Sequence, residues 1–130
     1  MTDIVPRLIA QLDYVVLLCD DIETMRAFYR DVMEMPLEAD SDRWVEFRLG
    51  NCAIVLRPRG RPYDGESAPR DSVAVQLAFK VEAREVDEWY RDLVRKGAEI
   101  VEAPTDQSWA HRTLFFRDLE GTLLEIYAEI

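Results

Sequence analysis

The chain repeats one short pattern twice, about sixty residues apart. Residues 28–32 spell FYRDV, and residues 89–93 spell WYRDL. Both segments lie where apolar residues recur at helical spacing, and both helical stretches follow an apolar strand pattern and precede several more. A unit of this length is too long for a solenoid repeat and too short for an independent domain. The repeat therefore predicts two modules, each a strand, a helix and three strands, that share one core.

Turn and capping signals give these elements their first boundaries. The first half predicts a strand over 12–18, a helix from the N-cap candidates Asp20 and Asp21 to Pro36, strands over 44–49 and 52–57 around Gly50 and Asn51, and a loop over 58–72. The second half predicts a strand over 73–81, a helix ended by Gly97, a strand over 98–101, and a hairpin of 112–116 with 122–127.

Composition bounds the class of protein. The chain has 130 residues, 48% of them apolar, and a formal net charge of -10. This is the size of one domain, with enough apolar side chains for a core without metals or disulfides. Because an acidic surface repels nucleic acid and anionic membranes, we expect neither as a partner. The N-terminal residues lack a secretory pattern, no apolar run could span a bilayer, and the two cysteines suit a reducing compartment, so we expect a cytoplasmic protein.

Three segments carry a family resemblance: LDYVVLLCDDIETMRAFYRDV, VQLAFKVEAREVDEWYRDL and HRTLFFRDLEGTLLEIYAE. The last contains an FxRDxxGxxxE pattern at residues 115–125. From about residue 11 onward the chain resembles the vicinal oxygen chelate superfamily, also called the glyoxalase, bleomycin-resistance and dioxygenase fold. The resemblance implies an α+β fold, in which two βαβββ modules form a cup-shaped mixed sheet with helices on its outer face. Residues 1–130 would form a single domain, with module one at about 11–57, the inter-module loop at 58–72 and module two at about 73–130.

The resemblance also implies where a metal would bind. In such proteins the ligands come from the first and last strands of each module, and those positions here are Tyr14, Val55, Gln76 and Glu125. Glu125 is intact, Gln76 is a neutral oxygen donor, valine cannot donate, and tyrosine would first have to ionise. A catalytic transition-metal site normally needs about three protein ligands. We therefore expect no tightly bound cofactor, although a divalent metal on Gln76 and Glu125 remains an open alternative. His111, the only histidine, is not at a ligand position.

Strand periodicity predicts which side chains share the cup with these positions, because alternate residues of a strand lie on one face. Leu77 and Phe79 would then pack toward the helix, as would Val75 and Val81. The opposite face would combine aromatic walls with a few polar groups, as small-molecule pockets do. The predicted ligand-binding pocket consists of Tyr14, Trp44, Arg48, Val55, Arg57, Gln76, Trp109, Glu125 and Tyr127.

Several of these side chains have two interpretations. Glu125 is a metal ligand, a general base or a ligand anchor, or else the partner of a structural arginine such as Arg57. Gln76 serves the site or merely bridges neighbouring groups. Trp109 caps the cavity mouth or lies at a dimer interface. A basic cluster around the inter-module loop attracts a carboxylate substrate or is simply a solvated linker; its members are Arg57, Arg59, Arg61 and Arg70.

These features lead to one functional hypothesis with two alternatives. The first is a homodimeric small-molecule binding protein with a degenerate metal site, of the sequestration or resistance type. The second is a lyase, epimerase or dioxygenase-type enzyme, in which Glu125 is a metal ligand or general base and Gln76 or Tyr14 holds an oxyanion. The third is a partner or regulatory domain without a ligand. The identity of the ligand stays open, as does the choice between a side-by-side and a module-exchanged dimer.

Overall fold

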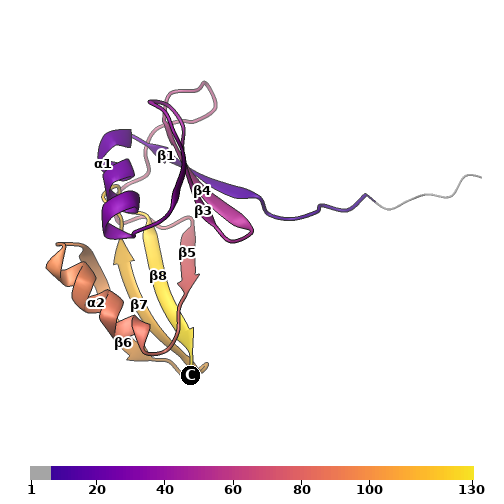
Figure 1. Ribbon diagram of the computed structural model, residues 1–130. Helices are drawn as coiled ribbons and strands as arrows, with labels where there is room; N and C mark the ends of the chain where they lie inside the picture. The colour runs from indigo at the N-terminus through magenta and orange to yellow at the C-terminus, as the bar shows by residue number, and fades with distance from the viewer. Residues whose placement is uncertain (1–6) are drawn as a thin grey trace, which may run out of the picture.

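The computed structural model describes residues 7–130, so the first six residues of the N-terminal pattern considered above lie outside it. The described chain is α+β with two βαβββ modules, as predicted, and each module has its own four-stranded mixed sheet (Figure 1). The strand orders are β1-β4-β3-β2 and β5-β8-β7-β6. Module one contains β1 (Tyr14–Cys19), α1 (Ile22–Ala27), η1 (Phe28–Val32), β2 (Leu37–Asp40), β3 (Val45–Leu49) and β4 (Cys52–Pro58). Module two contains β5 (Gln76–Lys80), α2 (Glu85–Arg95), β6 (Glu99–Asp106), β7 (His111–Arg117) and β8 (Leu123–Glu129).

The helix of module one begins where the sequence predicts but changes its form midway. Asp21 is the N-cap, since its side chain accepts hydrogen bonds from the backbone N–H groups of Glu23 and Thr24. After Ala27 the helix widens into the π-helical turn η1, with the N–H of Met33 bonded to the carbonyl of Phe28 at 3.0 Å. Helical spacing alone predicted one regular helix here. Phe28 and Tyr29, the first two residues of this turn, are both buried.

The edge strands of both sheets differ most from the sequence predictions. The sequence analysis assigns no strand to residues 37–40. LEAD alternates Leu and Ala with Glu and Asp, but the segment is short, and in the structure all four residues are exposed. It is a strand only because its backbone pairs with β3. Likewise β6 extends to Asp106 instead of ending at residue 101, and it includes Pro104, which an edge strand tolerates. β5 is shorter than predicted and begins at Gln76, so Val75 lies outside it and is exposed.

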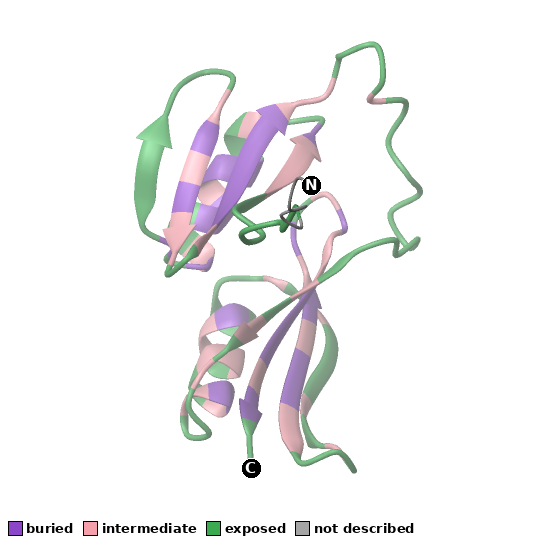
Figure 2. Ribbon diagram, turned by 90° about the vertical axis from the view of Figure 1, so that its right-hand side faces the viewer, coloured by how far each residue is buried: buried purple, intermediate pink, exposed green. Residues whose placement is uncertain are grey.

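One face of each sheet is covered by the helix of its own module (Figure 2). Alternate residues of the central strands fill the core, as the periodicity predicted. They are Val45, Phe47, Ile54 and Leu56 in the first sheet and Leu114, Phe116, Leu124 and Ile126 in the second. These rows form one hydrophobic cluster that runs through both modules, with Leu77 and Phe79 packed at its edge. Neither helix of the described chain is long and apolar enough to cross a membrane.

The two modules are joined by buried polar contacts, which we call the junction. Tyr29 donates from its hydroxyl to Asp118 Oδ2 at 2.8 Å, and both residues are fully buried. The other oxygen of Asp118 accepts from the backbone N–H groups of Glu120 and Thr122. Glu120 in turn accepts from the backbone N–H groups before α1, at 2.8 and 2.9 Å. Gly121 completes the turn at φ 95°, where a Cβ would come within 2.7 Å of a carbonyl oxygen of the inter-module loop. The FxRDxxG segment therefore fastens module two to the helix of module one.

Candidate functional site

The face of each sheet that carries no helix holds most of the predicted site residues. In the first sheet this face, the first wall, contains Tyr14, Trp44, Glu46, Arg48, Val55 and Arg57. Tyr14 and Trp44 lie edge to face, with ring centroids 5.9 Å apart, above the fully buried Val55. The Tyr14 side chain is still 45% exposed. The first wall is therefore an aromatic surface that nothing in module one fully covers.

In the second sheet the corresponding face, the second wall, contains Gln76, His111, Phe115, Glu125 and Tyr127. Gln76 donates from Nε2 to Glu125 Oε1 at 2.8 Å, so β5 and β8 bring these two predicted residues together. Glu125 is only 8% exposed. Burial raises the pKa of Glu125 above its ordinary value, and the bond from Gln76 and the nearby His111 oppose this only in part. Glu125 is thus a carboxyl group that its surroundings hold closer to protonation than a surface glutamate.

His111 belongs to the second wall, although the sequence analysis placed it outside the ligand positions. Its ring stacks on that of Tyr127, with centroids 4.7 Å apart. The sequence could have predicted this position of His111. Phe115 pairs with Glu125 in the hairpin, and alternate residues of a strand lie on one face, so Phe115, Thr113 and His111 share the face of Glu125.

The arginines predicted for the pocket are held by carboxylates of module one and of the inter-module loop. Arg57 forms a two-pronged ion pair with Asp64 of the inter-module loop, at 2.8 and 2.7 Å. Together with backbone N–H groups of the loop, Arg57 holds the pKa of Asp64 well below its usual range. The interpretation in which Arg57 pairs with Glu125 is therefore wrong. Arg48 bonds to Glu38 at 2.8 Å and lies 3.4 Å from Glu46.

The rest of the basic cluster holds the loop in place. Arg59 reaches Asp20 at 3.2 Å and the carbonyl of Asp64 at 3.0 Å. Arg70 bonds to the carbonyl of Leu119 at 2.7 Å and to Glu99 at 2.8 Å. Trp109 lies in the turn between β6 and β7 and is 58% exposed.

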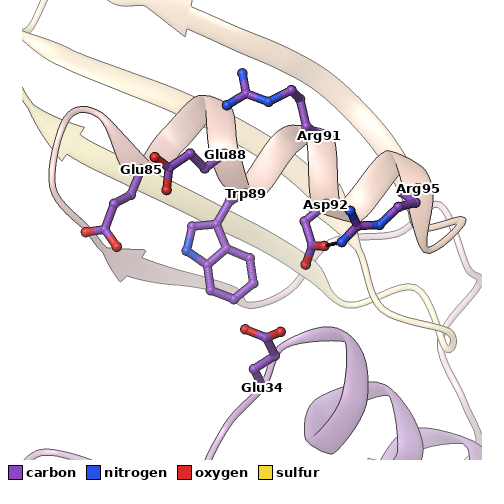
Figure 3. Close-up of a pocket in the computed structure, with 7 residues that line it drawn as sticks. All are labelled: Glu34, Glu85, Glu88, Trp89, Arg91, Asp92 and Arg95. Carbon is purple, nitrogen blue, oxygen red and sulfur yellow. Dashed lines mark hydrogen bonds and ion pairs between the residues drawn. The ribbon is translucent and has the colours of Figure 1, made fainter.

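Within one chain the predicted site residues fall into two groups. Over the described residues, the strands of the two sheets bond only within their own sheet, and one sheet lies above the other (Figure 1). The linings of two surface hollows contain none of the predicted pocket residues, although Arg59 and Arg70 of the basic cluster line the smaller one. One, of about 460 Å³, lies between α2 and Glu34 and is lined mainly by charged side chains around Trp89 (Figure 3). The other, of about 200 Å³, lies beside the junction. The first hollow lacks the apolar walls of a small-molecule pocket, whereas the second is lined in part by apolar residues such as Leu17, Leu18 and Leu123.

The second wall fits a metal poorly. Over residues 7–130, no three His, Cys, Asp or Glu side chains lie close enough together to hold a metal ion. Of the four positions implied by the resemblance, Val55 has no donor atom, and Gln76 turns its amide N–H toward Glu125. One carboxylate and one amide fall short of the three ligands that catalytic sites normally supply. We therefore derive no step that passes through a metal.

Two βαβββ modules, each with a four-stranded sheet and a helix on one face of it, define the fold class of the chain. A sequence profile of the Glyoxalase/Bleomycin resistance protein/Dioxygenase superfamily matches residues 11–126, and the chain belongs to this superfamily.

Among curated proteins, the chain is 24% identical over 123 residues to metallothiol transferase FosB of Staphylococcus saprophyticus. The matched region covers 92% of this chain and 78% of that protein. It is 30% identical over 125 residues to the uncharacterized protein YraH of Bacillus subtilis, with 85% and 92% covered. Among solved structures, a family enzyme from Burkholderia phytofirmans superposes with a TM-score of 0.81 at 22% identity, covering 93% of this chain and all of that one. The structural likeness supports the fold.

Proposed function

We propose that the protein is a homodimeric small-molecule binding protein, in which the first wall of one copy faces the second wall of the other. The ligand would lie between Tyr14 and Trp44 on one side and Gln76, Glu125 and Tyr127 on the other. This proposal rests above all on one observation: two open, aromatic walls that the single chain does not bring together. Aromatic walls with a few directed polar groups are the composition of small-molecule pockets.

The edges of the sheets support pairing with a second copy. β1 and β5 are each the first strand in the order of their sheet, so each has one edge without a partner among the described residues. Exposed apolar residues lie in the segments just before these two strands and at the start of β1, and the segment before β1 runs out as an extended arm (Figure 1). They are Leu8, Ile9, Leu12, Tyr14, Val73 and Val75. Open edges with apolar side chains are sites of association between chains.

The experiment has two stages. The oligomeric state is measured by light scattering, and a library of planar aromatic compounds is screened for those that raise the melting temperature. Trp44→Ala should abolish the effect of a stabilising compound, whereas Tyr63→Ala, which removes an exposed aromatic residue of the inter-module loop, should preserve it. A monomer, or stabilisation that survives Trp44→Ala, would contradict the proposal.

Mixed dimers distinguish exchanged modules from side-by-side copies. In an exchanged dimer of Trp44→Ala with Glu125→Gln, one cup carries both changes and the other carries neither. Half of the sites should therefore regain wild-type affinity. If each copy supplied both of its own walls, every cup would carry one change and no affinity would return.

A second candidate function is catalysis, which the environment of Glu125 favours. Its pKa is raised by burial, and a carboxylate with a raised pKa is suited to act as a general base. The curated relatives named metallothiol transferases point in the same direction. Glu125 would take a proton from a carbon next to a carbonyl group, and the amide of Gln76 would orient the carboxylate. If Glu125→Gln left every measurable turnover unchanged, this function would fail.

A further inference from the structure

The charged groups of the two walls are not evenly matched. Three basic side chains of the walls, those of Arg48, Arg57 and Lys80, form ion pairs within their own chain. Arg48 bonds to Glu38, Arg57 to Asp64, and Lys80, beside Tyr127 on β5, lies 3.1 Å from Glu129. Arg117, at the junction end of β7, bonds to the carbonyl oxygen of Gly121 at 2.9 Å. An anionic ligand would have to displace a carboxylate before it could use Arg48, Arg57 or Lys80, whereas Arg117 bonds only to carbonyl oxygens within the described residues.

Glu125, in contrast, forms no ion pair among the described residues. It is nine-tenths buried, its Oε1 accepts from Gln76, and no other donor among the described residues bonds to it. A buried carboxylate without a cationic partner is costly, and an added cation removes that cost. Oε2 of Glu125 accepts no hydrogen bond from the described residues, so it is suited to a donor that carries positive charge.

Aromatic rings surround this position. Phe115 pairs directly with Glu125 across the ladder, and Tyr127 is the next residue on the same face of β8. Under the proposed dimer, the edge-to-face pair of Tyr14 and Trp44 would form the opposite wall. A cation is attracted to the faces of aromatic rings, and this attraction strengthens when water is excluded. The walls therefore favour a planar apolar body that carries a positive charge.

We propose that the ligand of this protein is an organic cation, a protonated amine or amidine on a planar aromatic body, whose charged N–H donates to Glu125 Oε2. This inference rests on the proposed binding function and names the chemical class of its ligand. The overall charge of -10 would assist by attracting cations toward the protein.

The test compares two probes with the same ring system, 9-aminoacridine, a cation at neutral pH, and acridine-9-carboxylate, an anion. Binding to the intact wild-type protein is measured by titration calorimetry at low and moderate salt. We expect the cation to bind at least about tenfold more tightly, because a charge-assisted hydrogen bond exceeds a neutral one by about that factor. Glu125→Gln should remove the preference, while Glu88→Gln, which removes the same charge from the exposed face of α2, should leave it unchanged.

Each remaining outcome overturns the inference. Equal binding of the two probes, tighter binding of the anion, or a preference that survives Glu125→Gln would show that the carboxylate does not select charge. Failure of both probes to bind would also refute it. The proposed function would still stand if the library screen yielded neutral or anionic compounds whose stabilising effect depends on Trp44. It would fall separately if no compound stabilised the protein. Melting curves of Glu125→Gln and Glu88→Gln confirm that both variants fold.

Discussion

The hydrogen bond between Tyr29 and Asp118 is the sharpest test of how the two modules are joined. Tyr29→Phe removes one oxygen atom and leaves the ring in place among core residues. Asp118 Oδ2 then loses its donor inside a fully buried site, at a distance of 2.8 Å from where the hydroxyl was. Water can replace the lost donor only by entering the junction. The change therefore tests a polar contact between modules without creating a large cavity.

The magnitude follows from the charge of the acceptor. A hydrogen bond to a charged group contributes about 1.5–3 kcal/mol, and leaving a buried acceptor without a donor costs a similar amount. We expect Tyr29→Phe to lower the free energy of unfolding by about 2 kcal/mol, which corresponds to a fall of roughly 6–10 °C in melting temperature for a chain of this size. The repeat offers a matched control in Tyr90, which occupies the equivalent helix position in module two. Its hydroxyl makes no hydrogen bond within the described residues, and it is only half-buried.

The assay is urea unfolding of the wild type, Tyr29→Phe and Tyr90→Phe at one protein concentration, since self-association makes stability depend on concentration. Tyr90→Phe should remain within about 0.5 kcal/mol of the wild type, as substitutions away from such contacts usually do. If Tyr29→Phe were as mild as Tyr90→Phe, the junction would not depend on this bond, and the reasoning would be refuted.

Three further predictions concern titratable groups. Asp64→Asn should lower stability at pH 7. The difference should begin to shrink below about pH 4 and disappear only as pH falls through the depressed folded-state pKa of Asp64, because the stabilisation is complete above the unfolded-state pKa and is lost between the two values. Urea unfolding at pH 7 and pH 2 checks this, and an equal difference at both would contradict it. Glu125→Gln should raise the melting temperature at pH 8 but not at pH 4, because the raised pKa of Glu125 makes its ionised form unfavourable in the folded state. A rise in melting temperature at both pH values would contradict this and indicate an effect of packing. Burial and the neighbouring Glu120 and Asp118 raise the pKa of Cys19 to about 12, so a disulfide reagent should leave Cys19 unmodified in the folded protein at pH 8, as peptide mass mapping would show.

The sequence by itself determined the two modules and the faces of their central strands. Alternation places Phe47 and Leu56, or Phe116 and Leu124, on one side of a strand, and burial requires that side to meet a helix. The same parity puts Glu125 on the opposite face with Gln76, the contact most important to the candidate site. The N-cap at Asp21 and the turn at Gly97 are equally local signals. All of these depend on neighbours within a few residues, so periodicity and residue type are sufficient to predict them.

Only the tertiary structure decided the contacts between distant polar groups. β2 exists because its backbone pairs with β3, since an alternation of only four exposed residues is too short to identify a strand. The choice of Asp64 and not Glu125 as the partner of Arg57 depends on the path of the inter-module loop. Tyr29 forms its hydrogen bond to Asp118, which lies 89 positions further along the sequence. Such pairings depend on how whole modules pack, because many residues of the same type could form them. The free energy of each pairing also depends on burial, which no single segment determines.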